Sequence, residues 1–150
     1  MSDTAELLFA NEAFYHVFRG RDLAAMEALW ARRAPIACVH PGWHALTTRE
    51  AVMESWENIL SNPEAPKVDC RGARAHLLGE LGPGKLGPGK LGPGVLGLVL
   101  CYEIIGRSVL TATNIFLRED GAWRMVHHHA GPCGTPPAEL AEAPPEEPIQ

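Results

Sequence analysis

The sequence predicts an α+β protein in which helices come first and an antiparallel sheet follows. Apolar residues recur at helical spacing in the first part of the chain, and beyond Lys67 the apolar period changes to two. Asp120-Gly121, between two such runs, is a strong hairpin signal. Helices followed by a run of strands are typical of the α+β class. With 150 residues, 46% of them hydrophobic, the chain suits one domain with a sizeable core.

Three helices are expected, each beginning at a side chain that can cap it and ending near a glycine or a proline. Their ranges, with the capping residue first, are Asp3–Gly20, Asp22–Ala34 and Thr47–Asn62. The residues at helical spacing within them include Leu7, Ala10, Phe14, Phe18, Leu23, Met26, Leu29, Trp30, Val52, Ser55, Trp56, Ile59 and Leu60. A short strand, Ile36–His40, is expected between the second helix and the third.

The sheet is expected to be a four-stranded antiparallel meander, which the short early strand would extend. Its first strand starts at Lys67, and the others are expected over Val95–Ile105, Val109–Arg118 and Ala122–Gly131. In the first strand the alternation slips at Gly72, where a β-bulge would restore one buried face. In the second strand, Val95–Ile105, the odd-numbered and the even-numbered residues are both mainly apolar, as is typical of a central strand covered on both sides.

The stretch LGPGKLGPGKLGPGVLG, residues 81–97, contains three overlapping copies of G-x-G-x-x-G and two near misses to a P-loop. A dinucleotide site needs a helix after this motif, because the pyrophosphate binds at the helix N-terminus, but here a strand follows. Every copy also contains proline, which lacks the N–H that would bind phosphate. We therefore expect residues 81–94 to be an expanded, exposed hairpin loop, and we expect no cofactor.

Composition limits the possible partners and the domain count. The net charge is −5 without any block of basic residues, which argues against nucleic acid and anionic membranes as partners. The start, MSDTAELLF, lacks the features of a signal peptide, so a cytoplasmic location is expected. Residues 132–150 contain six prolines, four glutamates and no basic residue, which predicts a disordered tail after a single domain at 1–131.

The four cysteines indicate neither a metal cluster nor a disulfide framework. They are Cys38, Cys70, Cys101 and Cys133, about thirty residues apart and without a C-x-x-C pair. Most are expected to be reduced, and the first three are expected to be buried.

Two stretches, FANEAFYHVFRGRDLAAMEALW (Phe9–Trp30) and TNIFLREDGAWRMVHHHAGP (Thr113–Pro132), carry a family resemblance. The chain resembles the SnoaL-like branch of the nuclear transport factor 2-like superfamily over about residues 5–132. The pattern R-x-D-G-x-W-x-x-V-H-x-H, Arg118–His129, is its most specific part, and the association domain of calcium/calmodulin-dependent protein kinase II has a similar ending. The resemblance implies a cystatin-like cone, in which a strongly curved antiparallel sheet wraps around the N-terminal helices and encloses a pocket.

The resemblance leaves two classes of function open, because this fold supports both enzymes and assembly modules. The enzymes include ketosteroid isomerases, dehydratases and polyketide cyclases, which would imply proton transfer on a small, largely apolar ligand. The alternative is a non-catalytic module with a vestigial pocket; in either case a homodimer through the outer sheet face is expected. Two positions that carry pocket arginines in the kinase association domain are Asn114 and Ala130 here, which does not favour a carboxylate ligand.

The last two strands provide the leading candidate residues. If the hairpin tip is Glu119–Gly121, then Asn114, Val126 and His128 share one face, and the resemblance places that face toward the cone. His128 can move protons near neutral pH, with Asn114 orienting a ligand. The alternative for His128 is a buried, hydrogen-bonded core histidine. His127 and His129 share the other face and could chelate a metal, but no third ligand is signalled, so no metal is expected.

Glu103 is the second candidate catalytic residue, since burial would raise its pKa and make it a plausible general base. Its neighbour Tyr102 has the opposite parity, so only one of the two can face the pocket. The alternative is a strand-end carboxylate turned to solvent or to a dimer contact.

Three aromatic side chains complete the predicted ligand site. His40 and Trp43 follow the short strand, at the expected pocket rim, where they could hold a flat apolar ligand. Trp56 is counted with them, although its helical spacing is explained most simply by the core.

Overall fold

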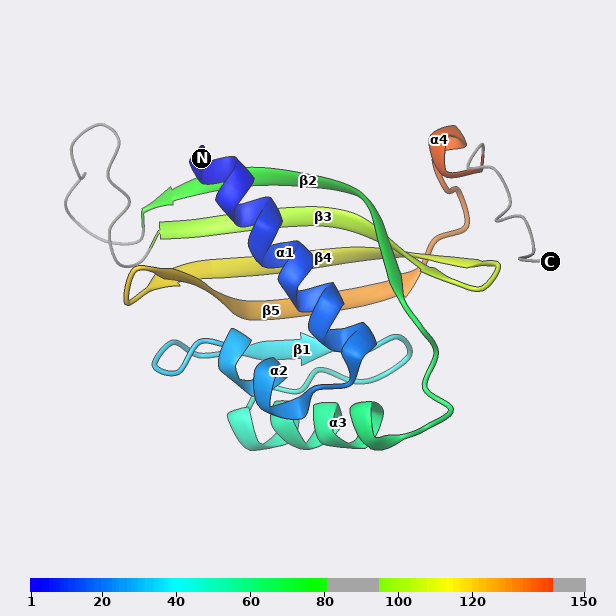
Figure 1. The fold of residues 1–150 in the computed structure, drawn as a ribbon, viewed down its shortest axis with the longest axis horizontal. Helices are drawn as coiled ribbons and strands as arrows, with labels where there is room; N and C mark the ends of the chain where they lie inside the picture. Colours follow the sequence, from blue (N-terminus) through cyan, green and yellow to red (C-terminus); the bar gives the residue numbers. More distant parts are fainter. Residues whose placement is uncertain (81–94, 142–150) are drawn as a thin grey trace.

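The computed structural model describes residues 1–80 and 95–141, which form helices packed against one curved five-stranded sheet. The helices are α1 (Asp3–Gly20), α2 (Leu23–Leu29), α3 (Arg49–Ser61) and α4 (Ala138–Ala141). The strands are β1 (Ala37–Val39), β2 (Asp69–Glu80), β3 (Val95–Ile105), β4 (Ser108–Glu119) and β5 (Ala122–Pro132). The helix α1 crosses one face of the sheet diagonally, with α2 and α3 beyond the β1 edge (Figure 1). The predicted α+β class is confirmed.

Local capping fixes where the helices begin, and it differs from the prediction at two of them. Asp22 caps α2 as expected, accepting a hydrogen bond from the Ala25 amide at 3.1 Å. However, Ser2 rather than the Asp3–Glu6 stretch caps α1, through the Ala5 amide at 3.2 Å. Thr48 rather than Thr47 caps α3. The Thr48 backbone is extended, and its hydroxyl accepts a hydrogen bond from the Ala51 amide at 3.2 Å.

The sheet order is β1-β5-β4-β3-β2, with β1 parallel to β5 and every other pair antiparallel. The predicted meander and its extension by the early strand are therefore confirmed. The register of β2 against β3 shifts between Arg71 and Arg74, and Gly72 there has φ +65°, which agrees with the predicted bulge. A further shift in the β4–β5 ladder leaves Val126 without a partner.

The core lies between α1 and the face of the sheet that it crosses, and α3 adds its buried side chains at the β1 edge. Phe14 on α1 packs edge-on against Trp56 on α3, with the ring centroids 5.6 Å apart. Where α1 crosses β3, Leu7 lies against Gly97 so closely that a Cβ there would be 2.5 Å from a Leu7 methyl carbon. This close approach seats the N-terminal half of α1 against the sheet.

The ends of the described ranges bear on the predicted loop and tail. The predicted expanded loop, 81–94, lies outside the described residues, as do residues 142–150. Within the predicted tail, α4 forms a helical turn at 138–141, preceded by Pro137, whose carbonyl accepts from the Leu140 amide at 3.0 Å. Among the described residues, no helix combines the length and the apolar character needed to cross a membrane.

Candidate functional site

Four elements bring a set of polar side chains together beneath α1. We call this set the buried polar cluster, and none of its members is more than 3% exposed. Its members are Asn11 and Tyr15 from α1, Cys101 and Glu103 from β3, Asn114 from β4, and His128 from β5. Alternate residues of a strand face the same side of a sheet, which is why the strand members all meet the helix.

Asn114 is the centre of the cluster. Its Nδ2 donates to Asn11 Oδ1 at 2.8 Å and to the Tyr15 hydroxyl at 3.2 Å. Its Oδ1 lies 2.6 Å from His128 Nδ1, so that ring nitrogen must carry the proton. In the neutral imidazole the lone pair is then on His128 Nε2, which lies 3.7 Å from Glu103 Oε2.

Tyr15 donates its hydroxyl proton to Glu103 Oε2 at 2.7 Å. Burial raises the pKa of Glu103, and the hydrogen bond from Tyr15 opposes that shift in part. Burial and the neighbouring Glu103 carboxylate raise the pKa of Tyr15 well above its ordinary value. The pair is therefore a basic carboxylate held by a tyrosine that keeps its proton.

His128 is neutral at neutral pH, although its distance from Glu103 would suit an ion pair. Burial, with smaller contributions from His40, His127 and His129, lowers the pKa of His128 to about 3. The effect of burial on the His128 pKa outweighs the attraction of the Glu103 carboxylate. The contact between His128 Nε2 and Glu103 Oε2 is therefore that of a neutral imidazole beside a carboxylate.

His40 lies beside the cluster but has its own partners. Its Nε2 donates to Ser55 Oγ at 2.9 Å, because the Ser55 hydroxyl proton is already used on the Val52 carbonyl at 2.6 Å. Burial lowers the pKa of His40 to about 4. Its ring packs between Trp43, at 5.1 Å between centroids, and Trp56, at 4.9 Å.

Of the predicted aromatic ligand residues, Trp43 is 46% exposed, whereas Trp56 is fully buried in the core. Tyr102 does not join the cluster, because it lies on the opposite face of β3 from Glu103 and packs beside Gly72. Glu103 is therefore the residue of the two that faces the helices, as their opposite parity allows.

The predicted hairpin tip, Glu119–Gly121, is wrong, because Glu119 pairs with Ala122, and Val126 is half-buried and packs against the core rather than lying opposite Asn114. The register shift makes Val126 the extra residue of a bulge, so Met125 is fully buried and His128 is the next inward residue of its strand. His127 and His129 lie on the other side as expected, with ring centroids 6.1 Å apart. His127 Nδ1 lies 3.0 Å from the Ala37 carbonyl oxygen, and burial lowers the His127 pKa. Within 1–80 and 95–141 no three side chains are grouped as a metal site would need.

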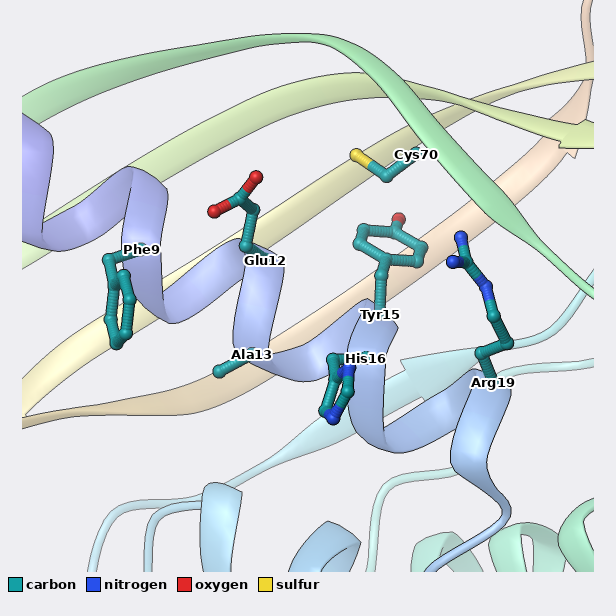
Figure 2. A pocket seen from close by; sticks show the side chains of 7 residues that line it. All are labelled: Phe9, Glu12, Ala13, Tyr15, His16, Arg19 and Cys70. Atoms are coloured by element: carbon teal, nitrogen blue, oxygen red, sulfur yellow. The ribbon is translucent and has the colours of Figure 1, made fainter.

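A groove of about 470 Å³ runs between α1 and β2. It is lined by Phe9, Glu12, Ala13, Tyr15, His16, Arg19 and Cys70. In Figure 2, Glu12, Tyr15 and Arg19 project from α1 toward the strand that carries Cys70. Tyr15 belongs both to this groove and to the buried polar cluster, so it lies between the groove and Glu103. None of the predicted ligand-binding residues lines this groove.

The sequence did not identify Asn11 or Tyr15 as polar site residues, and it predicted Ser55 only as part of the buried helix face, not as the partner of His40. A signal for Asn11 was present, since it lies four residues after Leu7, inside the apolar stripe of α1, where a buried amide needs polar partners. Tyr15 follows Phe14 within the same buried face, and its hydroxyl gives no local sign of the partner that it reaches.

Comparisons with known proteins agree with this architecture. A family model for the SnoaL-like domain matches residues 8–82, which is half of the chain. A solved structure from Streptomyces avermitilis, described as a candidate dehydratase of the NTF2-like family, is 26% identical with a TM-score of 0.71. The match covers 89% of this chain and 97% of that one.

Two further relatives differ in kind. A candidate calcium/calmodulin-dependent protein kinase type II association domain from Thiobacillus denitrificans is 30% identical, with a TM-score of 0.56, over 83% of this chain and 92% of that one. The F-box protein SKIP8 of Arabidopsis thaliana is 22% identical over 127 residues, which is 85% of this chain. The chain spans about half of that protein's length, 49%. The family match and the fold confirm the resemblance read from the sequence: the chain belongs to the SnoaL-like domain family.

Proposed function

We propose that this SnoaL-like chain binds a small, largely apolar molecule between α1 and the sheet and transfers a proton on it, with Glu103 as the base. The observation that carries the proposal is the 2.7 Å hydrogen bond from Tyr15, a groove-lining residue, to Glu103 Oε2. The likeness to a candidate dehydratase supports the same class of chemistry. Removal of a proton next to a carbonyl group is a step that isomerases, dehydratases and cyclases can share.

The contacts of Tyr15 suggest how the proton would travel. Glu103 is only 3% exposed, so a molecule in the groove meets Tyr15 first. In a concerted step the substrate proton would pass to the Tyr15 oxygen as Tyr15 passes its own proton to Glu103 Oε2. No tyrosinate forms, which suits a tyrosine whose pKa is raised well above its ordinary value.

His128 and Asn114 would position the base. Asn114 fixes the His128 tautomer through the 2.6 Å contact to Nδ1, which directs the Nε2 lone pair toward Glu103. After Glu103 has gained a proton, this lone pair lies 3.7 Å away and would accept a hydrogen bond from the carboxylic acid after a small approach of the two groups. The raised pKa of Glu103 makes it a stronger base than an ordinary carboxylate.

Deuterium exchange tests the proposal without knowledge of the natural substrate. The protein in D₂O is mixed with cyclohexanone, acetophenone and β-tetralone, and loss of the α-hydrogen signals is followed by NMR. We expect Glu103→Gln and Tyr15→Phe to slow the exchange of an accepted ketone about a hundredfold, the lower range for loss of a general base. Glu64→Gln, at an exposed carboxylate outside the cluster, is the matched control and should retain the wild-type rate.

Two outcomes would contradict this function. One is that all three ketones exchange their α-hydrogens no faster with the wild-type protein than in buffer alone. The other is a Glu103→Gln variant that folds, as judged by its thermal unfolding, and still exchanges at the wild-type rate.

The second candidate function is assembly, and the outer face of the sheet supports it. Leu100 on β3 is 40% exposed there, next to Thr113 of β4, and Tyr102 and Ile115 lie on the same face. Likeness to a kinase association domain supports self-association, and the exposed apolar side chains make this face the candidate surface. Light scattering should then give a dimer that Leu100→Lys converts to a monomer, and a wild-type monomer at micromolar concentration would rule it out.

A further inference from the structure

The groove beside Tyr15 continues along α1 into a second hollow. This hollow has a volume of about 410 Å³ and is lined by Met1, Ala5, Leu8, Phe9, Glu12 and Ala73. Phe9 and Glu12 line both spaces, so the two adjoin, and we call them together the α1 trough. Because a helix rises about 1.5 Å per residue, Ala5 lies about 15 Å from Tyr15 along the helix axis. The trough is therefore long enough for an extended molecule.

The two ends of the α1 trough differ in chemistry. The end at Tyr15 is polar, because His16 and Arg19 line it beside the tyrosine. Cys70 at this end was expected to be buried but is half-buried. The second hollow is mainly apolar, and Phe9 in its wall is 65% exposed. An exposed apolar surface with a polar border is typical of a binding groove for a molecule that has one polar end.

The bulge in β2 borders the second hollow. The ladder pairing is interrupted between Arg71 and Arg74, and Ala73 lies in that interval. Ala73 is half-buried against the core and lines the hollow with a single methyl group. On the helix side, Ala5 is equally small. Larger side chains at these two positions would fill the space between the helix and the strand.

The charges along the α1 trough disfavour an anionic ligand. The Arg19 guanidinium forms an ion pair with Asp69, so its positive charge is already balanced. Glu12 lines both spaces and takes part in no ion pair within residues 1–80 and 95–141. A ligand carboxylate in the trough would meet this negative charge, whereas an uncharged carbonyl group would not be repelled.

We propose that the α1 trough binds an uncharged molecule with a long, unbranched alkyl chain. Resting on the proposed proton transfer, we place a carbonyl group at the head of this molecule, beside Tyr15. The alkyl chain then runs along α1 past Phe9 into the second hollow, and Ala73 determines how far it reaches. Each methylene group that leaves water for an apolar surface raises the affinity about fourfold. The length of the chain therefore controls which carbonyl compounds bind.

The test compares 2-butanone with 2-nonanone, two ketones that share the carbonyl end and differ in chain length. Binding is measured by saturation-transfer NMR, and exchange of the α-hydrogens in D₂O is followed in the same samples. 2-Nonanone should bind at least about tenfold more tightly than 2-butanone, since an open groove buries only part of the chain. Nonanoate should bind at least about threefold more weakly than 2-nonanone, and Glu12→Gln should reduce that difference.

Ala73→Phe should remove the preference for the longer ketone, because the phenylalanine ring would occupy the second hollow. His76→Phe is the matched control, since it places the same ring on the same strand at an exposed position of the opposite face, and it should keep the preference. Ala5→Phe fills the same hollow from the helix and replaces Ala73→Phe if that variant does not fold.

The proposal is overturned if the wild-type protein binds 2-nonanone no more tightly than 2-butanone. It is also overturned if a folded Ala73→Phe or Ala5→Phe variant keeps the full preference. The same samples separate this proposal from the proton transfer. A preference in binding without any exchange would contradict the proton transfer and leave the alkyl-chain site standing, whereas equal binding and exchange of both ketones would do the reverse.

Discussion

Lowering the pH from 7 to 5 should destabilise the folded protein, because two buried imidazoles must stay neutral. The pKa of His128 is lowered to about 3 and that of His40 to about 4, from an ordinary value of 6.5. Below pH 6.5 the unfolded chain binds a proton at each position and the folded chain does not. The stability is therefore present in full above pH 6.5 and is lost as the pH falls toward the two lowered values.

The size of the loss follows from the pKa differences. Each pH unit below 6.5 costs about 1.4 kcal/mol for each imidazole, or roughly 2 kcal/mol apiece at pH 5. Glu103 acts in the opposite direction, since its raised pKa lets the folded chain bind a proton at a pH where the unfolded chain does not. The total change therefore mixes both signs, and a comparison with a variant at one imidazole isolates the His128 contribution.

The assay is urea unfolding at pH 7 and pH 5, followed by the fluorescence of the buried Trp30 and Trp56. His128→Asn keeps a donor for Asn114 Oδ1 and removes the titration. The drop in unfolding free energy between the two pH values should be about 2 kcal/mol smaller in this variant than in the wild-type protein. His44→Gln, at an exposed histidine, should show the wild-type drop. An equal drop in His128→Asn and in the wild-type protein would refute the reasoning.

Three further changes follow from the packing. Gly97→Val should destabilise the fold by about 1–3 kcal/mol in urea, because its Cβ would lie 2.5 Å from a Leu7 methyl carbon; no loss would show that α1 can shift freely. Asn114→Ala should cost about 2–5 kcal/mol in the same assay, since it leaves His128 Nδ1 and Asn11 Oδ1 without partners, and a loss under about 1 kcal/mol would argue against that network. Replacing 85–93 by a short turn beyond the last ladder pair, Glu80 with Val95, should change stability by less than about 1 kcal/mol; a large loss by calorimetry would mean that the repeat is structural.

The elements of the fold could be predicted because their signals are local. The bulge at Gly72 was predictable, since the alternation of apolar residues visibly slips there and glycine suits its positive φ. The bulge at Val126 was not, because Met125 and Val126 are both apolar and either could have been the inward residue. The first bulge therefore shows in the sequence through its glycine and the slipped alternation, and the second has neither signal.

The candidate site was predictable in part for the same reason. Strand parity left open whether Glu103 or Tyr102 faces inward. His128 faces inward with Asn114 because the bulge at Val126 offsets a hairpin tip that is one residue shorter than predicted. The contacts of Glu103 and Asn114 with Tyr15 depend on how α1 lies across the sheet, which long-range packing decides and no short pattern encodes. The groove was missed because Glu12 and His16 have the spacing of a solvated helix face, and only the approach of β2 makes that face one wall of a groove.

The energetics of the buried polar cluster favour chemistry over assembly as its purpose. Below pH 6.5 the neutral state of His128 costs stability, and at higher pH ionisation of the desolvated Glu103 costs stability too. Replacing such buried groups by apolar side chains of similar volume often leaves the stability unchanged or raises it. A module that only self-associates through the outer face therefore needs neither group. The outer face and the cluster are separated by the sheet itself, and lysine at Leu100 would remove one function without touching the other. The stability lost to Glu103 and His128 is thus the physical reason for proposing that the protein uses them.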